Sequence, residues 1–87
     1  MRRVSSYGPE ANYEVKFTEM DVENGTCKIA FLNAPTDRLN AKITDPDFLV
    51  PNNKYVLALA SQETITIVGK PTIRDGEIER LFISNTT

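Results

Sequence analysis

The chain has 87 residues, of which 40% are hydrophobic and 25% are charged, and its formal net charge at pH 7 is −2. This length is typical of one small domain with a thin core, and so mild a charge does not indicate electrostatic capture of a polyanion. The chain contains no histidine, which excludes a Ser–His or Cys–His nucleophilic pair and removes the commonest metal ligand.

The glycines and carboxylates of the chain do not form a catalytic motif. The four glycines are isolated from one another, so the chain has no Gly-rich phosphate loop. The close carboxylate pairs Asp45/Asp47 and Glu77/Glu79 fall in a turn and on a hairpin strand, where they have ordinary structural roles. We therefore expect no enzymatic activity, no cofactor, no metal and no small-molecule substrate.

The sequence also indicates the cellular compartment of the protein. The single cysteine, Cys27, cannot form an internal disulfide, and the N-terminal residues lack the apolar segment of a secretory signal. The longest apolar stretch, residues 55–60, is far shorter than the roughly 20 residues that span a bilayer. We expect a soluble cytoplasmic protein without membrane contact.

The first elements in chain order are an arm and a hairpin. Residues 1–11 show no periodicity and are predicted to be a flexible arm, in which Arg2-Arg3-Val4-Ser5 matches the pattern that basophilic kinases accept. Residues 12–20 and 26–32 alternate apolar and polar side chains, which predicts two strands. A three-residue loop at Glu23-Asn24-Gly25 would set Phe17 opposite Phe31 and leave both apolar sets on one face. A two-residue loop would separate those sets, so we favour the three-residue loop.

Four more strands are predicted after this hairpin. They cover residues 38–44, 54–61, 63–69 and 72–84, the last range containing a turn, and residues 85–87 form a tail. Residues 55–60 are apolar on both parities, which indicates a central strand covered on both sides. Asp75-Gly76 predicts a two-residue turn that pairs Ile73 with Ile78 and Arg74 with Glu77.

Six short strands in so short a chain predict an all-β fold. We expect residues 12–84 to form a small antiparallel barrel of five or six strands, OB-like or SH3-like. Cys27 shares the parity of Ile29 and Phe31, so it is predicted to be a buried small hydrophobe rather than a reactive thiol.

Small barrels without catalytic groups usually act by binding, and we expect a protein partner or self-association. Phe48, Leu49 and Val50 are three consecutive large apolar residues in a loop, and they either plug the end of the barrel or contact a partner. Tyr7 is a candidate anchor in the arm. The edge strand at residues 39–44 is a candidate for pairing with a second copy of the chain.

Single-stranded nucleic acid is the alternative partner. Lys16, Lys28 and Lys42 fall on the polar face of the first three strands, which is the face that OB-type barrels use to bind such strands. Tyr13, Phe17 and Phe31 have the inward parity, so the aromatic side chains needed for base stacking are absent from that face. This absence and the net charge of −2 favour a protein partner.

Overall fold

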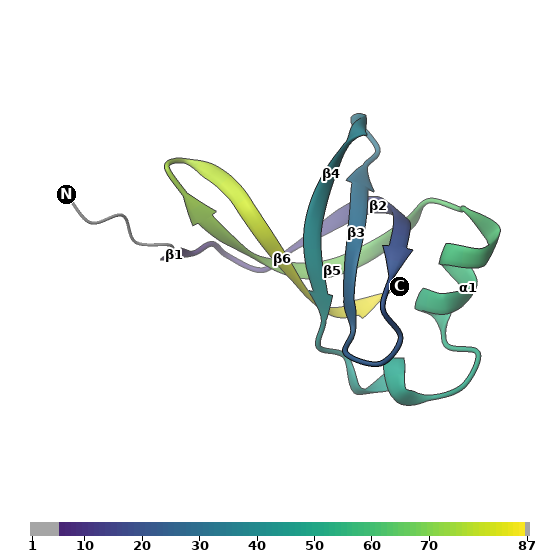
Figure 1. Ribbon diagram of the computed structural model, residues 1–87. Coiled ribbons are helices and arrows are strands. Elements are labelled where there is room, and N and C mark those ends of the chain that lie inside the picture. Colours follow the sequence, from purple (N-terminus) through teal and green to yellow (C-terminus); the bar gives the residue numbers. More distant parts are fainter. Residues whose placement is uncertain (1–5, 87) are drawn as a thin grey trace.

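The computed structural model describes residues 6–86 (Figure 1). Within this range the chain forms six strands, a short 3-10 helix and one α-helix. The strands are β1 (Ser6–Tyr7), β2 (Ala11–Met20), β3 (Thr26–Phe31), β4 (Ala34–Ile43), β5 (Ile65–Arg74) and β6 (Glu77–Thr86), and the helices are η1 (Pro46–Leu49) and α1 (Lys54–Ser61).

Five strands close into a barrel. Their order is β5-β2-β3-β4-β6, and pairing of β5 with β6 completes the circle, while β1 is an extra strand on β5. The predicted small all-β barrel is therefore confirmed. The expectation that it is antiparallel throughout is wrong at one seam, where β4 and β6 pair in parallel through Ala41↔Leu81 and Ile43↔Ile83. This seam follows from the chain order, because the intervening strand β5 is antiparallel to β6 and the chain therefore returns in the direction of β4.

The first hairpin has a wider turn than predicted. Phe17 pairs with Ile29 rather than with Phe31, and a bulge lies between Phe17 and Glu19. The turn covers residues 21–25 and is held by side-chain oxygens: Glu23 N donates to Asp21 Oδ1 and Thr26 N donates to Asn24 Oδ1, both at 2.9 Å. The predicted three-residue loop is therefore wrong, although the apolar sets of the two strands do share one face.

The last hairpin has the predicted turn. Asp75 and Gly76 have φ angles of 54° and 79°, and Ile73 pairs with Ile78. The predicted break between residues 69 and 72 is wrong, because β5 continues through Pro71, whose carbonyl accepts a hydrogen bond from Gly8 N at 2.9 Å.

The chain is also more ordered at its ends than predicted. Ser6 and Tyr7, placed in the flexible arm, pair with Ile73 and Thr72 as β1. The β6 strand includes Asn85 and Thr86, which were placed in the tail. The kinase-type pattern Arg2-Arg3-Val4-Ser5 lies outside the described residues.

The predicted central strand at residues 54–61 is wrong, because this segment is the helix α1. Asn53 caps the helix: its Oδ1 accepts from Tyr55 N and Val56 N, each at 3.0 Å. The segment contains Leu and Ala, which favour helices, and a single β-branched residue, Val56. Tyr55 and Ala58 are buried three residues apart, a helical spacing that also explains apolar residues on both strand parities.

The core connects this helix to the barrel. Phe17, Ile29, Ile67, Leu81 and Ile83 are fully buried inside the barrel. Tyr55 of α1 adds its ring to this core, lying edge-on to Phe17 with ring centroids 6.0 Å apart. The Tyr55 hydroxyl donates to Asp45 Oδ2 at 2.7 Å, so its polar end is satisfied within the core.

Two glycines with the same backbone conformation allow a matched test of the first turn. Gly25 and Gly76 have φ angles of 78° and 79°. A Cβ on Gly25 would lie 2.9 Å from the Ile43 carbonyl oxygen, whereas a Cβ on Gly76 meets nothing within 4 Å. In both alanine variants the left-handed conformation should lower the free energy of unfolding by about 1–2 kcal/mol. We expect Gly25→Ala to lose a further 1 kcal/mol or so from overpacking. Urea unfolding measures the difference, and equal losses would contradict this account of Gly25.

Candidate functional site

The parallel seam between β4 and β6 is short, and this shortness opens the barrel wall. The seam begins at Ala41 and Leu81, so the β3–β4 and β5–β6 hairpins diverge before it (Figure 1). A cleft of about 680 Å³ lies there. Residues from β2, the tip of the β3–β4 hairpin and β6 line it: Asn12, Tyr13, Glu14, Phe31, Leu32, Asn33 and Ile78.

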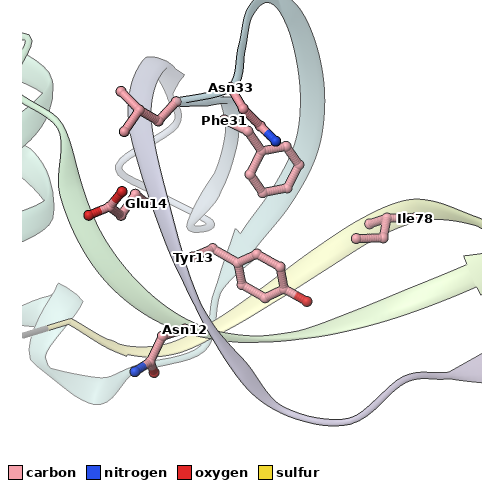
Figure 2. A pocket seen from close by; sticks show the side chains of 7 residues that line it. Asn12, Tyr13, Glu14, Phe31, Asn33 and Ile78 are labelled. Carbon is pink, nitrogen blue, oxygen red and sulfur yellow. The ribbon is translucent and has the colours of Figure 1, made fainter.

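The cleft has an apolar centre. Figure 2 shows the rings of Tyr13 and Phe31 and the side chain of Ile78 arranged around the same hollow. The two rings are tilted by 46° with centroids 5.6 Å apart, and all three side chains are half-buried. Leu32 at the rim is 59% exposed. Glu14 is the one charged residue in this lining, so the cleft offers mainly apolar contact area.

Sequence parity placed Tyr13, Phe17 and Phe31 inside the barrel. Phe17 is fully buried, but Tyr13 and Phe31 lie where the wall is open and reach the surface from the inside. Parity shows which side of a strand a residue faces, and it does not show where the barrel opens. No local pattern in the sequence indicated this site.

An unpaired strand edge borders the cleft. Over residues 77–80, β6 pairs with β5, and within residues 6–86 no strand pairs with its other edge. Ile78, which lines the cleft, belongs to this segment. Unpaired edges of this kind can add an extended chain as a further strand. By contrast, the predicted free edge at residues 39–44 is covered by β6 from Ala41 to Ile43.

The predicted apolar loop is divided between core and surface. Phe48 is 9% exposed and lies edge-on to Tyr55, with ring centroids 6.2 Å apart. Leu49 and Val50 are exposed. Phe48 therefore closes the core beneath η1, and only the other two side chains are accessible to a partner.

The three predicted lysines have different surroundings. Lys28 and Lys42 lie on the outer face of β3 and β4, and the Lys28 ammonium is 3.6 Å from a Glu19 carboxylate oxygen. Lys16 is half-buried and lines a separate hollow of about 250 Å³ with Arg38. Tyr7, the predicted anchor, is 66% exposed on β1.

Two of the carboxylates that were considered for catalysis have structural roles. Asp45 accepts hydrogen bonds from Asp47 N and from the Tyr55 hydroxyl, so its carboxylate caps η1 and satisfies the core tyrosine. Glu79 forms an ion pair with Arg74 at 3.4 Å. Among residues 6–86, no group of three or more His, Cys, Asp or Glu side chains is placed to hold a metal ion.

Two buried groups have raised pKa values. Burial raises the pKa of the Cys27 thiol to about 12, as predicted for a buried residue of this kind. Burial, together with the hydrogen bond to Asp45, raises the pKa of Tyr55 far above its usual range. Both groups therefore stay neutral across the physiological pH range.

The fold and the cleft define a small β-barrel domain with a mainly apolar cleft at its open wall. The chain belongs to a family of unknown function (DUF7947), whose family model matches residues 9–87. No curated protein and no solved structure matches the chain. Within residues 6–86, no helix is long and apolar enough to cross a membrane.

The raised pKa values predict that alkali destabilises the fold. The folded state holds the Cys27 proton more tightly than the unfolded chain, so stability falls as pH rises above the usual value of 9.0. This group alone should lower the free energy of unfolding by about 1.4 kcal/mol at pH 10 relative to pH 8. Urea unfolding at both pH values measures the loss, and Cys27→Ala should lose correspondingly less. An equal loss in the variant would exclude Cys27 as the cause.

Proposed function

We propose that this barrel is a protein-binding module that takes an extended segment of a partner protein in the cleft and catalyses no reaction. The observation that carries the proposal is the half-buried set of Tyr13, Phe31 and Ile78 beside the unpaired edge of β6. A partner strand can hydrogen-bond to that edge while one of its apolar side chains enters the cleft.

The chemistry of the cleft favours a peptide over a nucleic acid at this position. Nucleic acids need cations for their phosphates, whereas the charged residue in the lining is the acidic Glu14. The volume of about 680 Å³ is within the range of pockets that enclose a small ligand, so it can accept one or two side chains.

We also propose that the barrel is of the OB type. The α-helix lies between the third and fourth strands of the barrel, and the fifth strand pairs in parallel with the third. OB-type barrels bind ligands on the face of their second and third strands and at the loop between the fourth and fifth. Ile78 lies beside the turn between the fourth and fifth barrel strands, which supports a ligand site at this end of the barrel.

Two exposed leucines provide a matched test. Leu32 at the cleft is 59% exposed and Leu57 on α1 is 53% exposed, so glutamate is tolerated equally at both. We expect a phage-displayed library of random 12-residue peptides to yield apolar, extended binders of the wild-type protein. Leu32→Glu should weaken their binding at least tenfold, because it places a charge beside an apolar contact, and Leu57→Glu should leave it unchanged.

Fluorescence anisotropy of the selected peptides measures these affinities, and circular dichroism confirms that both variants fold. The proposal is overturned if no peptide is enriched. It is also overturned if Leu32→Glu binds the selected peptides as tightly as the wild type does.

A further inference from the structure

A pair of aromatic side chains lies on the outer wall of the barrel, away from the cleft. The rings of Tyr7 on β1 and Phe82 on β6 have centroids 6.2 Å apart and are tilted by 43°. Tyr7 is 66% exposed and Phe82 is half-buried. The neighbours of Phe82 on β6, Leu81 and Ile83, face inward and are fully buried, so Phe82 faces outward.

Cationic side chains surround this pair. Phe82 pairs with Lys42 on one side and with Lys70 on the other, which forms a row across three strands. The next row on the same side of the sheet contains Arg80, Thr72 and Tyr7. The Lys70 ammonium lies 5.3 Å from the centre of the Tyr7 ring, within the range of a cation–π contact. We call this surface the basic–aromatic face, and it consists of Tyr7, Lys42, Lys70, Arg80 and Phe82.

This face is positive on a chain whose formal net charge is −2. Lys42, Lys70 and Arg80 are all exposed, and none of them forms an ion pair with another residue in the range 6–86. Neither of the two rows contains an Asp or Glu side chain. The surrounding acidic residues therefore do not neutralise the three cations, and an anionic partner complements them.

We infer that the basic–aromatic face binds single-stranded nucleic acid. Lys42, Lys70 and Arg80 would contact phosphates, and bases would stack on the exposed ring of Tyr7 and on the accessible part of the half-buried Phe82 ring. Aromatic rings beside cations distinguish this ligand from a purely ionic polymer, which has no planar groups to stack. A double helix is disfavoured, because its bases are already stacked on one another and the face offers no element to enter a groove.

This inference goes beyond the proposed protein-binding function and does not depend on it. The cleft and the basic–aromatic face have no residue in common. The face also differs from the nucleic-acid surface predicted from the sequence. It keeps Lys42 and replaces Lys16 and Lys28 with Lys70 and Arg80.

The test uses a fluorescein-labelled 20-nucleotide oligothymidylate and the full chain. Anisotropy at 20 mM salt should show micromolar binding. Three phosphate contacts predict that the affinity falls about 100-fold when salt is raised tenfold. Tyr7→Ala should weaken binding about tenfold through lost stacking, and Lys70→Ala should also make the salt dependence shallower. Lys54→Ala, which removes an exposed lysine on α1, is the control and should bind like the wild type.

Competitors separate stacking from simple charge attraction. An unlabelled oligothymidylate should displace the probe, whereas a polyglutamate of equal charge and a 20-base-pair duplex should displace it poorly. Absence of binding at 20 mM salt overturns the inference. Equal competition by polyglutamate or duplex, or wild-type affinity in both Tyr7→Ala and Lys70→Ala, also overturns it. Peptide binding at the cleft is tested separately, through Leu32. A negative result with the oligothymidylate therefore does not decide whether the cleft binds a peptide.

Discussion

Closure of the barrel depends on one short parallel seam. Three residue pairs between β4 and β6 join the two halves of the sheet, starting at Ala41 and Leu81. Thr44 adds two hydrogen bonds at the end of the seam next to Ile43. Its amide and its hydroxyl both donate to the Ile83 carbonyl, at 2.7 and 3.0 Å. A longer seam would draw the two hairpins together and eliminate the cleft, so the same few pairs determine both closure and access.

The helical crossover from β4 to β5 completes the core. Because β5 lies between β4 and β6 in the sequence and is antiparallel to β6, the chain passes through β4 and β6 in the same direction. It leaves β4 through η1 and α1, and these elements bring the Phe48 and Tyr55 rings onto the barrel. The hydrogen bond from Tyr55 to Asp45 ties the helix to the start of the crossover. Part of the barrel is thus covered by the crossover, and the cleft lies where no such cover exists.

Local sequence patterns predicted strands and the last turn, but not the features that depend on three-dimensional closure. Alternation identified β2 and β3, and Asp75-Gly76 identified the β5–β6 turn. The helix α1 was missed, although Asn53 before a Leu- and Ala-containing segment is an N-cap signal. Tyr13 and Phe31 were assigned correctly to the inner side, yet their exposure depends on where the seam begins. Lys70 and Phe82 each alternate with inward residues, but only the register of β5 with β6 makes them neighbours.

The two-residue strand β1 covers the outer edge of β5 and carries Tyr7 to Phe82. It is held by two residue pairs and by the hydrogen bond from Gly8 N to the Pro71 carbonyl. Detachment of so small an element costs little free energy, so it opens locally far more often than the whole domain unfolds. Each opening exposes the outer edge of β5 to other chains and separates Tyr7 from Phe82. Protection of the β5 edge and integrity of the aromatic pair therefore depend on the same local opening of β1. A ligand that contacted both Tyr7 and Phe82 would shift this equilibrium toward the closed state.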